Sequence, residues 1–410
     1  RTILVERHPI LGGMGTAALV NNFCNAHWDG IRFIIGGIFA ELRSRLVARR
    51  ALHQTLFIEC YDPSVFIEEV GALIGGAGVE VRCGSGLKAI SFSGEDGVVA
   101  DLTDGTRITA RTVVDASGDA IVAHAAGVPC TFGRAKDGRV MPLTWCYLLG
   151  GIDVGEFGRE YPDLVHDDDL TGERRIYFDA AAKRINALIA SDRSAGLLSI
   201  PRDHVATLMS VPRQSGVVTV NYGRVFISDP TDPAQLAAAE AEGLRQIDDG
   251  IAFFRRRIGG FQRAELVQTA LQIGVRESRQ IVGRYTLTRE DVVENRQFDD
   301  AIAQCCYPMD IHEPDSDRTT FISPRVGAHF DIPWRSLVPL EGPPNLVVAG
   351  RCISGTHEAM SSFRVSPSLM AVGEAAGIGA ALAARHDGRI ASVDPSRIRR
   401  ILAERQAILT

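Results

Sequence analysis

The chain has 410 residues, more than one hydrophobic core usually organises, so we expect two domains. Hydrophobic residues make up 45% and charged residues 23% of the sequence, which is ordinary for a globular protein and argues against disorder. A net charge of −6 without long basic runs gives no electrostatic reason to expect nucleic acid or an acidic membrane as a partner.

Cysteine spacing and hydropathy indicate a reducing, cytoplasmic setting. The longest apolar stretch, residues 33–40, is too short to span a bilayer, and the N-terminal residues lack the pattern of a signal peptide. The eight cysteines form no C-x-x-C pair and no zinc spacing, so we expect thiols and no metal site. For the adjacent Cys305 and Cys306, two ordinary thiols are favoured over a vicinal disulfide.

The first predicted element is a strand that ends in an acid. Residues 2–6 (TILVE) form a β-branched, apolar run typical of a buried parallel strand, and Glu6 ends it. A dinucleotide-binding fold binds the adenosine ribose with such an acid, about 20 residues after a G-x-G-x-x-G turn. That turn is absent from this sequence. Gly12 and Gly13 follow the acid, and Thr16 adds a hydroxyl.

Helices are expected over 36–50 and from Pro63, which Asp62 would cap, with a short strand over 79–82. The glycines at 75, 76 and 78 follow a helix and precede a strand, the reverse of a phosphate loop, so no separate NAD(P) domain is predicted. Residues 87–117 alternate like an antiparallel meander.

A second strand–turn–helix pattern follows the meander. The strand over 112–116 breaks at "DASGD" into a helix, which is the right order for a cofactor contact. Residues 131–334 are more polar, with strand-like runs at 205–209, 216–221 and 225–228 and a long helix from Pro233 to about Arg257. Near the end, "NLVVAG" predicts a buried strand, and a helix rich in small residues is expected from Pro367 to about Arg385, capped by Ser366.

Four segments carry a resemblance: "VERHPILGGMGT", "VVDASGDAIVAHAAGVP", "GVRESRQIVGRYTLTREDV" and "NLVVAGRCISGTHEAMSSFRVSPSLMAVGEAAG". Together they resemble the FAD-dependent oxidoreductases of the glutathione-reductase structural class, over nearly the whole chain and most weakly in its middle third. The resemblance implies an α/β protein. Its Rossmann-like FAD-binding domain, in three layers with a mostly parallel sheet plus the meander, would comprise 1–130 and 335–410. An α+β substrate domain would comprise 131–334.

In that family a first strand with G-x-G-x-x-G precedes the acid, over about 30 residues. We therefore interpret the sequence as starting inside a dinucleotide-binding unit, as a fragment or a mis-started chain, with a natural protein lacking the loop as the minority alternative. We expect this chain to bind FAD poorly and an upstream segment to restore binding in an absorbance titration.

The resemblance also implies cofactor contacts. Glu6 would bind the ribose, and glycines would let the backbone approach the FAD diphosphate. Asp119 either contacts the cofactor or caps a helix, and Arg351, where many relatives have an acid, either meets phosphate or structural carbonyls. A helix N-terminus at the flavin N1/O2 edge would stabilise negative charge there. The implied set is Glu6, Gly12, Gly13, Thr16, Ser117, Gly118, Asp119, Gly350, Arg351, Ser366, Pro367, Ser368 and Leu369.

Four residues are catalytic candidates. His357 is the first choice to face the flavin ring as a proton donor or acceptor, with structural capping as the alternative, and Glu358 either holds it or faces solvent. Arg364 would clamp a substrate carboxylate or pair with a structural acid. Asp310 and His312 share one face of the extended segment "YPMDIH".

Three other features rank lower. In "VRESR", Arg276, Glu277 and Arg279 form a charged cluster that is more often an internal salt-bridge lattice than catalytic machinery. In "NNFCNAH", Asn22, Asn25 and His27 would reach the flavin or satisfy a turn. Cys352 is expected to be a structural thiol.

The expected function is a two-electron oxidation or reduction of an unidentified small organic substrate, by hydride transfer at flavin N5, with an unidentified electron donor or acceptor. A monooxygenase using external NAD(P)H is one alternative. The other is a non-catalytic scaffold that does not bind FAD.

Overall fold

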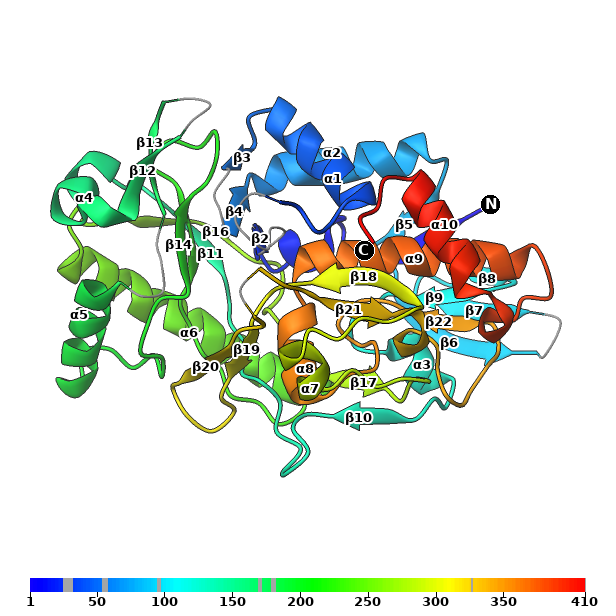
Figure 1. Cartoon of the computed structure of the whole chain (residues 1–410). Coiled ribbons are helices and arrows are strands. Elements are labelled where there is room, and N and C mark those ends of the chain that lie inside the picture. Colours follow the sequence, from blue (N-terminus) through cyan, green and yellow to red (C-terminus); the bar gives the residue numbers. More distant parts are fainter. Residues whose placement is uncertain are drawn as a thin grey trace.

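The computed structural model describes residues 1–24, 32–53, 58–93, 97–168, 172–177, 182–325 and 327–409. Figure 1 shows two lobes: green elements from the middle of the chain form one, and blue, cyan and orange elements from the two ends of the chain form the other. Parallel and antiparallel sheets are both present, so the predicted α/β class is confirmed.

The parallel strands occur as two pairs. β1 (Ile3–Glu6) pairs with β5 (Glu80–Cys83), and β9 (Val113–Asp115) pairs with β22 (Leu346–Val348). Their β-branched residues favour the extended backbone, and β22 is buried along its whole length. Each pair ends near glycine turns that carry candidate site residues, because the carboxyl ends of parallel strands meet at one edge.

Helices cover these strands in the same lobe (Figure 1). Asp62 caps α2, accepting a hydrogen bond of 2.9 Å from the Ser64 N–H, and proline at its first position needs no partner for an N–H, so both predicted start signals are confirmed. The helices are α1 (Gly37–Ala48), α2 (Pro63–Gly76), α3 (Ile121–Ala125), α9 (Ser366–Ala384) and α10 (Pro395–Glu404).

Among the described residues, α9 is the one helix long and apolar enough to cross a membrane by length and composition alone. It packs against strands β2, β9, β18 and β22 and against helices α1 and α10. These surroundings explain its composition as that of a core helix, since small residues allow close packing on every side.

Two antiparallel sheets flank the parallel strands. The predicted meander is confirmed as β6 (Leu87–Phe92), β7 (Val98–Leu102) and β8 (Arg107–Ala110). The second sheet follows the first glycine turn and comprises β2 (Asn22–Cys24), β4 (Ile58–Tyr61) and β3 (Leu52–His53). It brings Cys24 toward the start of α9, which contacts β2.

The other lobe is built around a four-stranded antiparallel sheet and α6 (Pro233–Arg257), as expected from its Asp232–Pro233 start. The strands are β14 (Thr207–Ser210), β15 (Val218–Asn221), β11 (Tyr147–Gly150) and β16 (Glu265–Thr269). The run 225–228 is not a strand, contrary to the prediction, because its backbone pairs only through an isolated bridge from Val225 to Leu143. Smaller elements are α4 (Val154–Glu160), α5 (Lys183–Ser194), β12 (Val165–Asp167) and β13 (Arg174–Ile176).

Short strand pairs and helices join the lobes and carry much of the candidate site. β19 (Met309–His312) pairs with β20 (Thr319–Ile322), β18 (Ala301–Cys305) with β21 (Phe330–Pro333), and β10 (Cys130–Phe132) with β17 (Arg279–Ile281). The helices are α7 (Arg289–Val293) and α8 (His357–Phe363).

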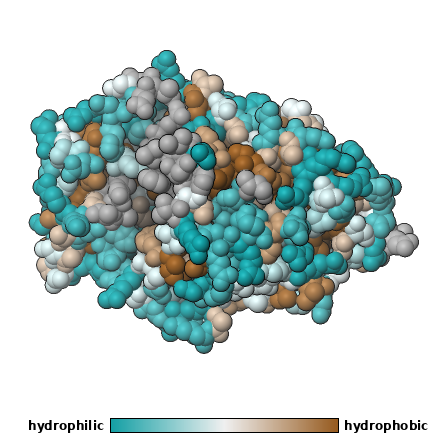
Figure 2. Space-filling view, viewed as in Figure 1, coloured by the Kyte–Doolittle hydropathy of each residue, from teal (hydrophilic) through white to brown (hydrophobic). Residues whose placement is uncertain are grey.

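Buried residues form separate clusters in the two lobes. One comprises mainly residues between 143 and 275, and another combines residues 281–338 with β9, β22 and α9. Part of the predicted second domain therefore shares a core with the Rossmann-like elements, and the predicted boundary stays a prediction. The face in Figure 2 is mostly hydrophilic, with apolar side chains in small groups.

Asp331 provides a test of this second core through pH. It is 1% exposed, and burial raises the pKa of its carboxyl to about 6, although the Phe298 N–H donates to it at 2.9 Å. The native state therefore holds a proton that the unfolded state releases near its ordinary value, so stability should fall as pH rises from about 4 to about 6. Asp331→Asn should remove this loss.

The measurement is urea unfolding of the wild type and Asp331→Asn at pH 4.5 and 7.5. Taking the difference between the two proteins at each pH cancels the contribution of groups that do not interact with Asp331. His329 lies 3.7 Å from Asp331, so the comparison is repeated with His329→Asn in both proteins. The variant should gain relative stability at the higher pH. A difference that stays constant between the two pH values would contradict this burial effect.

Candidate functional site

The first glycine turn follows β1 directly. Gly12 has φ of +108° and Gly13 has φ of +56°, conformations that favour glycine, and a Cβ on Gly13 would meet nothing within 4 Å. The Thr16 hydroxyl donates to the Leu11 carbonyl at 2.7 Å, so it closes this turn. Glu6, at the end of β1, accepts from the His8 N–H at 2.8 Å. An open, glycine-lined turn next to a strand-end acid thus forms one part of the candidate cofactor site.

The second and third turns lie together at the ends of β9 and β22. Gly118 and Gly350 have φ of +77° and +96°, and a Cβ on Gly350 would lie 3.8 Å from the Gly118 Cα. The Ser117 hydroxyl donates to Asp115 at 2.6 Å and accepts from the Ile121 N–H at 3.0 Å. Side chains of the "DASGD" motif thus hold a turn whose backbone at Gly118 lies close to the turn at Gly350.

Asp119 and Arg351 join these two turns by an ion pair. Ser278 also donates to Asp119, at 2.6 Å. Burial alone would raise the pKa of Asp119, but the Arg351 charge and the Ser278 hydrogen bond lower it overall. Asp119 is not the N-cap of α3, which is Ala120, so the capping alternative is wrong. The Nε of Arg351 is buried without a protein partner among the described residues.

The start of α9 differs by one residue from the prediction. Its N-cap is Val365 in extended conformation, so Ser366 is not the cap and Pro367 takes the second helical position. Leu369 N–H donates to the Val365 carbonyl at 3.1 Å, and proline is tolerated because the first helical N–H groups have no intrahelical partner. The Ser368 hydroxyl donates to the Gln304 carbonyl at 3.0 Å.

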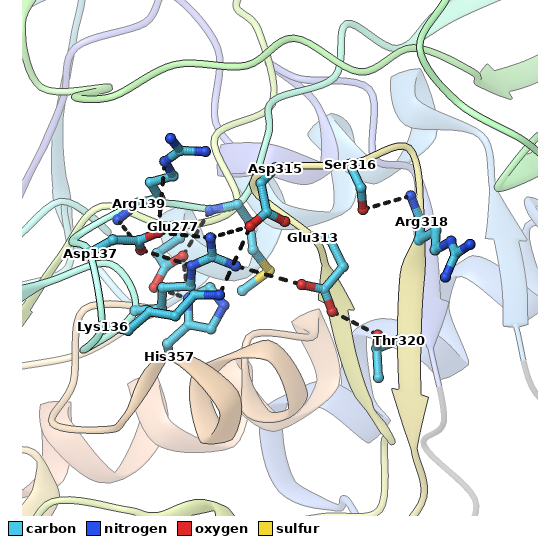
Figure 3. Close-up of polar contacts among 12 residues, drawn as sticks. Lys136, Asp137, Arg139, Glu277, Glu313, Asp315, Ser316, Arg318, Thr320 and His357 are labelled. Carbon is cyan, nitrogen blue, oxygen red and sulfur yellow. Dashed lines mark hydrogen bonds and ion pairs between the residues drawn. The ribbon is translucent and has the colours of Figure 1, made fainter.

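His357 and Glu277 form a buried pair (Figure 3). Nδ1 of His357 lies 2.9 and 2.8 Å from the two carboxylate oxygens of Glu277, and both side chains are almost fully buried. Glu277 also accepts from the Met141 N–H at 2.9 Å. The other ring nitrogen of His357, Nε2, is buried and has no partner in the part of the protein that the structure describes. An oriented imidazole with one free nitrogen is suited to proton transfer.

This pair corrects two expectations. Thr356 caps α8, so the capping alternative for His357 is wrong, and of the two alternatives for Glu358 the one in which it holds His357 is not the case, because Glu277 does. Glu277 belongs to the "VRESR" cluster that ranked low as a salt-bridge lattice. Its partner lies 80 positions away in sequence, and nothing in the charged cluster indicated that contact.

Asp310 stands at the centre of a second polar group. His312 Nε2 lies 3.2 Å from its Oδ2, the Tyr307 hydroxyl donates to the same oxygen at 3.2 Å, and an Arg364 Nη2 lies 3.1 Å from it. Burial alone would raise the pKa of Asp310, but His312, Arg364 and Arg276 lower it well below its usual value. Arg364 thus pairs with an acid of the protein, which was the alternative to substrate binding.

His312 has protein partners at both ring nitrogens. Nδ1 lies 3.5 Å from an Arg224 Nη2 and 3.3 Å from the Thr319 hydroxyl. Burial and the nearby arginines lower the pKa of His312 well below its usual value, so the ring is neutral. Saturated hydrogen bonding favours a role in orienting Asp310, and the predicted catalytic role stays a prediction.

The cysteines are all free thiols, including Cys305 and Cys306. Burial raises the pKa of Cys24 to about 12 and raises that of Cys352 still further, so neither is a reactive thiolate. The Cys24 thiol donates to Asn22 at 3.3 Å. Asn25 and His27 lie outside the described residues.

The sequence matches a known family over residues 1–402, described as FAD dependent oxidoreductase. The chain belongs to this family. No protein of curated function matches the sequence. Because family membership alone specifies neither the substrate nor the reaction at the cofactor, the four catalytic candidates stay predictions.

Solved structures resemble this one at low sequence identity and with TM-scores below 0.5. A geranylgeranyl bacteriochlorophyll reductase-like protein from Thermoplasma acidophilum is 12% identical, with a TM-score of 0.42, 99% of this chain and 77% of that chain covered. The p-nitrophenol 4-monooxygenase from Pseudomonas putida is 13% identical, with a TM-score of 0.35. The match covers 94% of this chain and 64% of that chain. The Diels-Alderase PyrE3 of pyrroindomycin biosynthesis is 14% identical, with a TM-score of 0.38, and the match covers 99% of this chain and 64% of that chain. The chain thus spans under two thirds of the length of these last two proteins.

Proposed function

We propose that this member of the family catalyses a two-electron oxidation or reduction of a small organic substrate, with His357 as the proton-transferring group. The observation that carries the proposal is that one segment supplies both parts of the site. Gly350 and Arg351 form a candidate cofactor turn at the end of β22, and His357 begins α8 six residues further on, held by Glu277.

The residues present fit FAD in three places. The open turn at Gly13 gives space for a diphosphate, and Glu6 lies at the strand end where a ribose hydroxyl is bound. Gly118 and Gly350 bring two glycine turns close together, with the Arg351 guanidinium against Gly118. FAD would supply the hydride-accepting or hydride-donating group at flavin N5.

His357 supplies what a flavin lacks, a residue that moves the substrate proton. Glu277 fixes the ring through Nδ1, which leaves Nε2 as the nitrogen that takes or gives a proton. The first turn of α9 directs N–H groups and the positive end of its dipole outward, where negative charge is stabilised.

The test is a titration with FAD, followed by absorbance, of the protein expressed from its complete reading frame. Saturable binding and reversible anaerobic reduction in one two-electron step would support the proposal. A protein that stays colourless with excess FAD would overturn it and favour the scaffold alternative. Oxygen consumption coupled to product hydroxylation would instead identify a monooxygenase.

A further inference from the structure

Four arginine side chains gather around Asp310 where the two lobes meet. Arg202 and Arg224 are each 1% exposed, and Arg276 and Arg364 are partly buried. Burial and the charges of Arg202 and Arg364 lower the pKa of Arg276 to about 9, which reflects their proximity. Buried charges are costly unless they are paired, so each of these arginines needs a partner that offsets its charge.

Arg224 has a structural role. Its Nη1 donates to the carbonyls of Glu313, Ser316 and Arg318 at 2.8–3.1 Å, and its Nη2 donates to the Thr319 hydroxyl at 3.0 Å. These bonds hold the turn between β19 and β20, and thereby the strand that carries Asp310. Both terminal nitrogens of Arg224 thus bond the protein itself, while its Nε is buried without a partner among the described residues.

Arg202 is not satisfied in this way. Its Nη1 donates to Asn221 at 3.2 Å and to the Gly223 carbonyl at 3.3 Å. Its Nε and Nη2 are buried and have no protein partner among the described residues. Burial, followed by the charge of Arg224, lowers the pKa of Arg202 to about 10.

Arg276 lies beside it across a short extended segment. Thr144 pairs with Gly274 on one side, and its hydroxyl donates to the Gly223 carbonyl on the other. Arg276 donates to the Pro142 carbonyl at 2.7 Å through Nη1, a neutral acceptor that leaves its charge unbalanced. Arg202 and Arg276 thus lie in two non-strand segments that Thr144 and the Gly223 carbonyl connect.

The acids near this cluster are engaged elsewhere. Asp310 is paired with Arg364, Asp203 lies 2.5 Å from His204, and Asp317 lies 2.8 Å from Arg193. His312 is neutral. Among the described residues, Arg202 and Arg276 therefore have no acid paired with them alone, and Arg202 keeps two buried N–H-bearing nitrogens without a partner. The planar guanidinium matches a carboxylate.

We propose that Arg202 and Arg276 bind a carboxylate group of the substrate, so that the enzyme acts on an organic acid. This inference rests on the proposed function for its reacting centre. Arg276 directly precedes Glu277, which holds His357, so one short segment of the chain carries a residue of each group. Arg364 and His357 stand at opposite ends of α8, which spans about 10 Å, the scale of a small organic acid.

The test measures binding rather than turnover, by calorimetry and thermal unfolding. Acetate, benzoate and succinate are compared with acetamide, benzamide and succinamide at equal ionic strength, with and without FAD. We expect saturable binding of at least one acid and at least tenfold weaker binding of its amide. Arg276→Gln should weaken binding of that acid at least tenfold, and Arg276→Lys should weaken it less.

Arg335→Gln is the matched control, since Arg335 is half exposed and pairs with Asp300 at 3.0 Å away from the cluster. It should leave the affinity unchanged. Failure of all three acids to bind, equal binding of acid and amide, or unchanged affinity in Arg276→Gln would overturn the inference. Because the acids are tested on the protein with and without FAD, a failure of flavin binding is recognised separately.

Discussion

Replacing His357 by Asn is expected to lower kcat by about 10²- to 10⁴-fold, the usual contribution of a positioned acid or base. Asn fills a similar volume and can donate one hydrogen bond to the Glu277 carboxylate, but it cannot carry a proton between substrate and solvent. Flavin absorbance should stay near that of the wild type, because the three candidate cofactor turns are untouched. Turnover of the flavin-loaded enzyme is the measurement.

Glu277→Gln separates positioning from proton transfer. A carboxylate stabilises the protonated imidazole, so its loss should lower kcat and move the acid limb of the pH profile to lower pH. Glu358→Gln, the neighbour of His357 that does not hold it, is the matched control and should have little effect on either. A pH profile that is identical in wild type and Glu277→Gln would contradict the role given to this pair.

Gly379→Ala should destabilise the protein, although alanine normally favours a helix by about 1 kcal/mol over glycine. A Cβ at residue 379 would overlap Cη2 of Trp334 and lie 2.9 and 3.0 Å from two further atoms of the indole. Trp334 is 3% exposed and rigid, so the core must shift. Overpacking of this kind costs about 1–3 kcal/mol, and we expect a net loss of stability.

Gly373→Ala is the control in the same helix. Residue 373 is exposed, and a Cβ there would meet nothing within 4 Å, so alanine should stabilise by up to about 1 kcal/mol. The measurement is the free energy of unfolding in urea for the two variants. Two variants that change stability in the same direction would show that α9 does not pack on Trp334 as described.

Local signals in the sequence were sufficient for elements with strong start and end residues. Asp62–Pro63 and Asp232–Pro233 predict α2 and α6 because an acid cap and a first-turn proline satisfy the helix start without any distant contact. The "DASGD" turn was predicted for a similar reason, since Asp115, Ser117 and Gly118 make it locally. The predicted start of α9 was wrong by one position: the N-cap is Val365 and not Ser366. A proline is tolerated at either of the first two helical residues, so Pro367 did not fix the start.

The candidate site could be predicted only in part. Family resemblance identified His357, but Glu277 is 80 positions away and its contact depends on the tertiary fold. Arg202 and Arg224 carried no signal, because an isolated arginine is usually a surface residue, and only the packing of β14, β15 and β19 buries them. Gly373 and Gly377 are exposed, whereas Gly379 in the same helix packs against Trp334, a difference that the run of small residues does not reveal.

A structure of the protein with FAD bound tests the central claim most directly. It is predicted to show the adenosine end at Glu6 and the ring system beside the first turn of α9, with Nε2 of His357 facing the space above the ring. Flavin density on another face of the molecule, or a ring separated from His357 by intervening protein, would contradict the account.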